Sequence, residues 1–112
     1  MSEENFNATE ITRKPPAAPD PNQKFWDLAD SFIQLANENC KDATLGQVCA
    51  SMMYATARFN AFTASNDAPT DAAFRQDLDN AVTYFRTEFD KMLKENFRDY
   101  AENFKSYHPE KS

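Results

Sequence analysis

The residues that most often carry catalysis or bind metals are few in this sequence and poorly spaced for either role. His108 is the single histidine, and it lies near the end of the chain. A di-iron site in a helical bundle needs Glu-x-x-His pairs and a structural zinc site commonly uses Cys-x-x-Cys, but neither spacing occurs. Cys40 and Cys49 have no base in prospect, which a cysteine nucleophile requires. A single glycine rules out a glycine-rich phosphate loop. We therefore expect no catalytic residue, no metal and no cofactor.

Arg58 and Asn60 stand out among the polar residues because they interrupt an apolar stretch. Within VCASMMYATARFNAF, which runs from Val48 to Phe62, Arg58 is the single charge. A buried guanidinium needs a carboxylate or a ligand anion as its partner. Three interpretations remain open. Arg58 forms a structural ion pair or reaches the rim of the core, it contacts a partner protein, or it binds a small anionic ligand together with Asn60.

The composition describes a small acidic domain. The 112 residues carry a net charge of −6, and 41% of them are hydrophobic, which is enough to build a core. The single glycine disfavours a β fold, because tight turns between strands commonly need glycine. An acidic surface repels phosphate backbones, so we expect no nucleic-acid partner.

No targeting or membrane signal is visible in the sequence. The N-terminal residues MSEENFNATEITRK contain no apolar run, and no stretch reaches the ~18 apolar residues of a membrane span. We therefore predict a cytoplasmic protein without a membrane partner. In that reducing compartment Cys40 and Cys49 are expected to be free thiols buried in the packing, with a redox or metal role as the alternative.

Capping residues and helical periodicity predict an all-α fold. Asp20 before Pro21 is typical of a helix start, Thr44 and Gln47 match a capping box, and Thr70 is a further cap. The sequence thus predicts a single domain, a three-helix antiparallel bundle at 21–107, preceded by a disordered, Pro-rich N-terminal arm at 1–20. Its helices are expected at about 21–41, 45–64 and 71–107, with a tail at 108–112.

The second helix is expected to be the central one. Val48 to Phe62 is apolar on all sides, and a helix of this kind is normally covered by its neighbours. The third helix is expected to be the longest, at ~55 Å against ~30 Å for each of the other two. Its large apolar residues recur close to the helical period. They are Phe74, Leu78, Val82, Phe85, Phe89, Leu93, Phe97, Tyr100, Phe104 and Tyr107.

The end of the third helix is the predicted interaction surface, because it overhangs the shorter helices. Phe97, Tyr100, Phe104 and Tyr107 lie on this overhang, and four aromatic rings are not expected to remain in water. Three arrangements would cover them. The helix breaks near Asn96 and folds back, the N-terminal arm wraps around, or a second copy of the chain packs there as a homodimer.

Three segments of the sequence resemble a family of short proteobacterial proteins that is catalogued only as a domain of unknown function. They read FWDLADSFIQLANE, YATARFNAF and YFRTEFDKMLKENFRDY, and the likeness covers roughly Phe25 to Phe104. The resemblance implies a small helical protein from the bacterial cytosol. It implies no activity, no ligand and no catalytic residue.

These observations favour a non-enzymatic protein-interaction module that acts as a homodimer. The alternative is a small anionic-ligand binder or a minor enzyme with a pocket at Arg58 and Asn60. An acidic mimic of nucleic acid is a weaker third hypothesis. The basic residues interleaved with acids in the third helix, such as Lys91 and Lys94, argue against one continuous acidic face.

Overall fold

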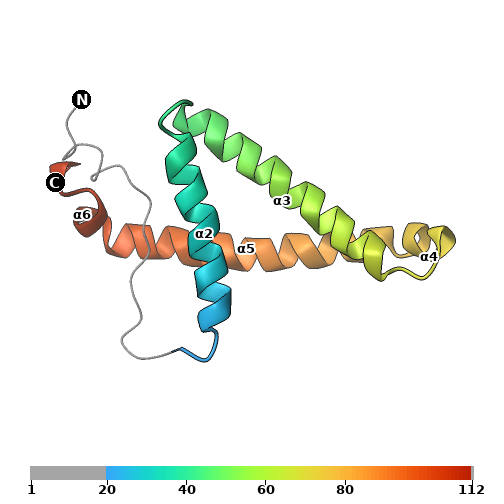
Figure 1. The fold of residues 1–112 in the computed structure, drawn as a ribbon. Coiled ribbons are helices and arrows are strands. Elements are labelled where there is room, and N and C mark those ends of the chain that lie inside the picture. Colours follow the sequence, from blue (N-terminus) through green and yellow to red (C-terminus); the bar gives the residue numbers. More distant parts are fainter. Residues whose placement is uncertain (1–19, 112) are drawn as a thin grey trace. The chain divides into compact units, whose positions relative to one another are not determined.

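The fold is described by a computed structural model that covers residues 20–111. These residues are helical and contain no strand, which confirms the predicted all-α class (Figure 1). The predicted arm at 1–20 lies outside the described residues, apart from Asp20. The elements are α2 (Gln23–Asn39), α3 (Leu45–Asp67), α4 (Asp71–Gln76), α5 (Leu78–Glu102), α6 (Phe104–Tyr107) and the 3-10 helix η1 (Pro109–Lys111).

The chain forms two compact units whose boundary lies inside α3. The first unit ends at Met53, and the second begins at Tyr54. The first therefore contains α2 and the beginning of α3, and the second contains the rest of α3 with α4, α5, α6 and η1. Each unit has its own local interactions, and each is described separately below.

The start of α2 is organised by Asp20. One carboxylate oxygen of Asp20 accepts the backbone N–H of Asn22 at 2.7 Å. The other oxygen accepts the indole N–H of Trp26 at 2.9 Å. Aspartate is suited to this place because its short acceptor binds the free donors at a helix start. Asp20 therefore binds free donors at the start of the helix, as predicted, although α2 itself begins at Gln23.

The start of α3 is a capping box, as predicted. The Gln47 N–H donates to the Thr44 hydroxyl at 3.1 Å, and the Thr44 N–H donates to the Gln47 side-chain oxygen at 3.0 Å. Each residue thus satisfies a donor that the first turn of the helix leaves free. This reciprocal pair fixes where the chain leaves the turn after α2.

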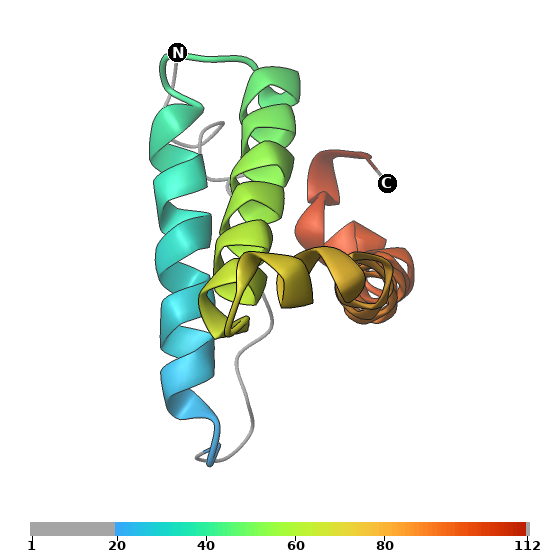
Figure 2. The ribbon, with the colours of Figure 1, turned by 90° about the vertical axis from the view of Figure 1, so that its right-hand side faces the viewer.

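The core of the first unit is small and lies at the closed end of its helical hairpin. Ala36 is 2% exposed, Val48 is 5% exposed and Asn37 is 6% exposed. Ala36 and Asn37 lie in the final turns of α2, and Val48 lies in the first turns of α3 (Figure 2). Farther from the turn, α2 keeps Phe25, Leu28, Phe32 and Leu35 about half exposed, between 49% and 63%.

The prediction that Val48 to Phe62 is covered on all sides is wrong. Val48 is the buried residue of this stretch, whereas Met53 is 58% exposed, Tyr54 is 67% exposed and Phe59 is 65% exposed. The apolar residues of α3 go all round the helix, so a single neighbour along its first turns covers only a part of them. Apolar composition indicates that a helix has surface to bury, but the chain must also supply enough partners.

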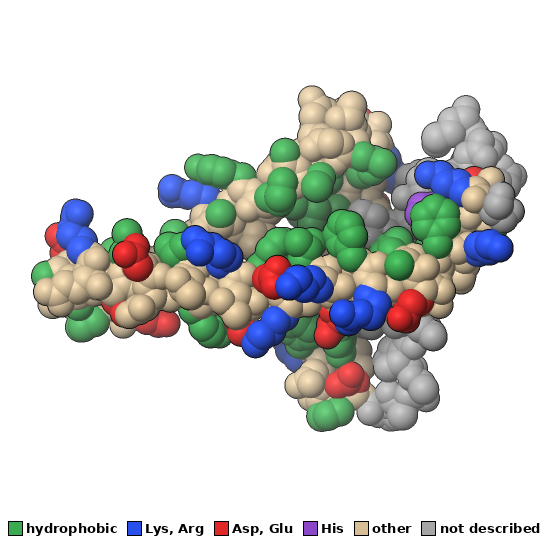
Figure 3. Space-filling model, turned by 180° about the vertical axis from the view of Figure 1, so that it is seen from behind, with side chains coloured by type: hydrophobic (Ala, Val, Ile, Leu, Met, Phe, Trp, Pro, Cys, Tyr) green, Lys and Arg blue, Asp and Glu red, His purple; other side chains and the backbone are tan. Residues whose placement is uncertain are grey.

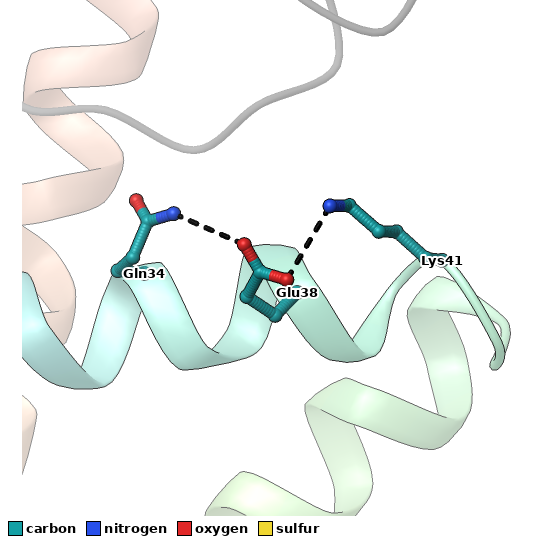
Figure 4. A network of polar contacts seen from close by, with 3 residues as sticks. All are labelled: Gln34, Glu38 and Lys41. Carbon is teal, nitrogen blue, oxygen red and sulfur yellow. Dashed lines mark hydrogen bonds and ion pairs between the residues drawn. The ribbon is translucent and has the colours of Figure 1, made fainter.

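An ion-paired network on the surface of α2 adds little to the stability of the hairpin. The Glu38 carboxylate accepts from Gln34 at 3.5 Å and pairs with the Lys41 ammonium at 3.3 Å (Figure 4). The Lys41 and Glu38 side chains are each about half exposed. Exposed pairs of this kind contribute about 0–1 kcal/mol, because water and salt screen them. The hairpin thus depends mainly on the capping box and the small core.

In the second unit, the long helix predicted for 71–107 is divided into three, so the exact three-helix bundle is not confirmed. Thr70 caps α4 as predicted, since its hydroxyl accepts the Ala73 N–H at 3.0 Å. Asp71 and Arg75, four residues apart, then form an ion pair at 2.9 Å. The first break follows at Asp77, whose carboxylate accepts from the Asn80 amide at 2.9 Å. Asp and Asn side chains compete with the helical backbone for hydrogen bonds and so favour helix ends.

Candidate interaction surface

The apolar side of α5 is a prominent exposed feature of the second unit. The exposed large side chains on this side keep between 41% and 70% of their surface in contact with solvent, and Phe97 is the most exposed of them, whereas Phe85 and Tyr100 are half-buried. Globular proteins rarely leave a continuous row of this size open unless it contacts something. The members of this apolar row are Leu78, Val82, Phe89, Met92, Leu93 and Phe97.

Charged residues of both signs occupy the other side of α5. Lys94 pairs with Asp90 at 2.9 Å, as the spacing predicts, and Lys91 pairs with Glu88 at 3.2 Å. Figure 3 shows these types of charged side chain interspersed with hydrophobic ones. The ion pairs on one side of α5 and the apolar row on the other side make it an amphipathic helix. It contains no single-sign field of the kind that an acidic nucleic-acid mimic needs.

A break near Asn96, one of the three arrangements considered, does not occur, because α5 continues through this residue to Glu102. The Asn96 amide donates to the Met92 carbonyl at 2.7 Å without ending the helix. The chain turns at Asn103 instead. The amide of Asn103 donates to the carboxylate of Asp99 at 2.8 Å and to its carbonyl at 3.1 Å, so it competes with the helical hydrogen bonds at this point.

After this turn the chain folds back and forms a C-terminal clasp, which we define as Asp99, Tyr100, Asn103 and Tyr107. The rings of Tyr100 and Tyr107 stack with centroids 4.3 Å apart and planes 24° apart. The Tyr107 hydroxyl donates to the Asp99 carboxylate at 2.7 Å. Fold-back of the overhang, one of the three expected arrangements, is therefore present, but it begins at Asn103 and covers only part of the predicted surface.

The four residues of the predicted surface have different environments. Tyr100 and Tyr107 are half-buried against each other. Phe104 is 44% exposed and lies 5.2 Å from the His108 ring, measured between centroids. Phe97 remains 70% exposed and belongs to the apolar row of α5. The structure thus brings the two tyrosines together and leaves the two phenylalanines open.

The clasp shifts the ionisation of both tyrosines. The hydrogen bond to Asp99, assisted by burial and by the negative charge of that carboxylate, raises the pKa of Tyr107 to about 12. Burial, followed by the same negative charge, raises the pKa of Tyr100. In both cases the neutral phenol is the form that the folded chain favours.

Titration of Tyr107 is expected to open the clasp at alkaline pH. Its pKa is raised on folding, so its contribution to stability is complete below about pH 10 and is lost as the pH rises through about 12. Ultraviolet absorbance of tyrosinate is expected to show a step near pH 12 that Tyr107→Phe removes. The same step in the variant would contradict the assignment to Tyr107.

The predicted ligand-binding pair does not gather into a site. Arg58 is exposed and Asn60 is half-buried on α3. No hydrogen bond or ion pair of the Arg58 side chain is found among residues 20–111, and the interaction recorded for Asn60 is its carbonyl accepting from Thr63 at 2.8 Å. Within these residues Arg58 thus forms no structural ion pair, and its reach to the rim of the core and its contact with a partner protein stay predictions. Its role in binding an anion stays a prediction.

A cavity of about 550 Å³ lies elsewhere in the second unit, between the end of α3, α4 and the beginning of α5. Phe74, Tyr84 and Phe85 line it, and its charged lining residues are Asp67 and Asp77. Neither Arg58 nor Asn60 contributes to this wall. Two carboxylates repel an anion, so this cavity gives no support to the anionic-ligand hypothesis.

The family of the protein follows from the part of the chain that forms these helices. A family model described as "Protein of unknown function (DUF3144)" matches residues 25–101. The chain belongs to this family. The matched DUF3144 region contains the whole apolar row of α5, whereas Asn103 and Tyr107 of the clasp lie beyond it. No curated protein and no solved structure gave a match.

Chemistry-bearing groups are sparse in the described part of this DUF3144 protein. Cys40 is half-buried and Cys49 is exposed, and both are free thiols. Within residues 20–111 no group of His, Cys, Asp and Glu side chains is arranged to hold a metal ion. In the same range no helix has the length and apolarity needed to cross a bilayer.

Sequence reasoning missed Asp99 and Asn103, which organise the clasp. The helix predicted at 71–107 runs through both positions without a break. A signal was available, because Asp99, Asn103 and Tyr107 are spaced at i, i+4 and i+8 and so lie on one side of a helix. An Asn in the middle of such a set is a candidate helix end as well as a candidate hydrogen-bond donor.

Proposed function

We propose that this DUF3144 protein is a non-enzymatic helical interaction module that acts as a homodimer through the apolar side of α5. The observation that carries this proposal is the exposure of the apolar row. Phe89 is 45% exposed, Leu93 is 41% exposed and Phe97 is 70% exposed on the same helix. Burying a side chain of this size contributes about 1.5–3 kcal/mol, so the open row is a large source of binding free energy.

A second copy of the chain is a suitable partner because it brings an apolar row of the same length. The six exposed side chains of the row offer roughly 500–600 Å² per copy, against ~800 Å² per partner in a standard stable interface. Neighbouring residues supply part of the remainder. A contact of this size lies at the low end of the range for specific interfaces. Small domains with little internal core gain stability by association.

The C-terminal clasp narrows the surface that was predicted from the sequence. Tyr100 and Tyr107 already cover each other, so they contribute less open surface than Phe97. The proposed interface therefore extends along α5 toward Val82 and Leu78 instead of being restricted to the C-terminal aromatic residues. Phe104, at 44% exposed, lies at its edge.

The native mass of the full chain tests this proposal. Light scattering at tens of micromolar chain is expected to give about twice the chain mass of 12.8 kDa. A triple variant with Phe97, Tyr100 and Phe104 changed to Ser removes part of the contact and is expected to shift the mass toward the monomer at the same concentration. Far-UV circular dichroism of the variant checks that its helices remain. A monomer mass for the wild-type chain overturns the proposal.

A further inference from the structure

Small side chains form much of the wall of the cavity between the end of α3, α4 and the beginning of α5. An alanine fills little space beyond its own backbone, so these three helices leave a volume of about 550 Å³ between them. Small-molecule sites in proteins commonly have volumes of ~300–1,000 Å³, so this cavity has room for a small organic ligand. The alanines of the wall are Ala64, Ala68, Ala73 and Ala81.

The apolar part of the wall is already partly removed from solvent. Phe74 and Phe85 are half-buried, as are the four alanines, whereas Tyr84 is exposed. The rings of Tyr84 and Phe85 meet edge to face, with centroids 5.2 Å apart. Aromatic faces attract organic cations as well as apolar groups. A ligand with an apolar body therefore finds surface to bury here, which a hydrated metal ion does not need.

The charged groups of the wall are all negative. Asp67 and Asp77 are exposed, and no lysine or arginine among residues 20–111 lines the cavity. Arg75, the basic residue nearest to Asp77 in the sequence, pairs with Asp71 at 2.9 Å. Carboxylates without a basic neighbour attract a positive charge, so a cation is the ligand that this cavity favours.

The two carboxylates differ in how far their charge is already compensated. Asp77 accepts a hydrogen bond from the Asn80 amide at 2.9 Å and precedes the first turn of α5, where the helix dipole favours a negative charge. Asp67 is the last residue of α3, where the dipole disfavours a negative charge. Within residues 20–111 the Asp67 side chain has no hydrogen bond or ion pair. A bound cation therefore gains most at Asp67.

We infer that this cavity binds a small organic ammonium ion with an apolar body, with Asp67 as its principal counter-charge and Asp77 as the second. The half-buried rings bury the apolar body, and the exposed acids hold the charge. This inference is independent of the proposed homodimer, because no residue of the apolar row lines the cavity. Either of the two can fail without the other.

Amide NMR spectra of the full-length chain test this inference, with phenethylammonium as the probe. Shifts at Ala64, Phe74 and Ala81 are expected to saturate with a Kd of roughly a millimolar, the range for a ligand of this size. Phenethyl alcohol has the same ring without the charge. Nα-acetyl-lysine amide has the charge without the ring and represents a lysine side chain of another protein. Each is expected to bind more weakly than the probe.

Three outcomes of the titration would overturn the inference. Absence of saturable shifts in the millimolar range means that the cavity does not bind such a cation. Equal binding of the alcohol shows that the carboxylates do not select charge. Equal binding of the lysine derivative shows that the aromatic wall does not select an apolar body.

Three variants place the bound cation in the cavity. Asp67→Asn keeps the shape of the side chain without its charge and is expected to weaken binding about 5-fold, the upper value for an exposed ion pair. Asp79→Asn is the matched control, because Asp79 is exposed on α5 and lies outside the wall. Ala81→Leu fills the cavity and is expected to abolish the saturable shifts, while far-UV circular dichroism checks that the helices remain. Equal weakening by both Asp→Asn substitutions, or unchanged binding in Ala81→Leu, overturns the site.

Discussion

Leu93→Glu is expected to convert the homodimer into monomers at tens of micromolar chain. Leu93 lies near the centre of the apolar row and is 41% exposed in the single chain, so a glutamate there is tolerated by the monomer. In the dimer the same carboxylate enters an apolar contact, once from each copy. An unpaired buried charge costs about 3–5 kcal/mol, which weakens the dimer by a factor of at least ~100.

Sedimentation velocity over a concentration series measures this effect, and Thr87→Glu is the matched control. Thr87 is exposed on the charged side of α5, so the control adds the same charge to the same helix outside the row. The control is expected to keep the wild-type dissociation constant within a factor of about 3, because exposed charges interact weakly. Equal weakening by both substitutions would show that net charge, and not the apolar row, governs the association.

Val48→Asp is expected to unfold the helical hairpin formed by α2 and the beginning of α3. Val48 is 5% exposed, and it shares the small core of the first unit with Ala36 at 2% exposed. The substitution removes apolar contacts and places a carboxylate where water does not reach. The expected loss is about 3–5 kcal/mol, a large part of the 5–15 kcal/mol that stabilises a typical domain.

Urea unfolding followed by far-UV circular dichroism measures this loss, with Ala50→Asp as the control. Ala50 is exposed on the same helix, two residues after Val48. Its substitution costs less than about 1 kcal/mol through helix propensity alone. Similar midpoints for the two variants would mean that the contact between Val48 and Ala36 does not hold the hairpin together.

The positions of the first helix starts were predictable because the signals that set them are local. Thr44 and Gln47 bond each other across one turn, and Thr70 bonds Ala73 across one turn. The sequence contains both partners of each bond at a fixed spacing, so no distant part of the chain is needed to predict them. The same holds for the ion pairs Asp71–Arg75 and Asp90–Lys94.

Helix ends inside long periodic segments were harder to predict. Asp77, Asn96 and Asn103 all have side chains that compete with the helical backbone, yet α5 ends at Asn103 and continues through Asn96. The difference lies in what surrounds each residue. The Asn103 amide donates to the backbone carbonyl and to one carboxylate oxygen of Asp99, and the Tyr107 hydroxyl donates to the other carboxylate oxygen and so holds the chain beyond the turn.

By itself the sequence determined the all-helical class, the starts of the first helices and the apolar periodicity of α5. These properties depend on residues that lie three or four positions apart. Only the tertiary structure decided that Arg58 and most of the stretch from Val48 to Phe62 are exposed, that the clasp closes at Asn103, and that the apolar row of α5 remains open. The reason is physical: burial is a relation between surfaces from distant parts of a chain, and a local pattern shows that a surface is apolar without showing what covers it.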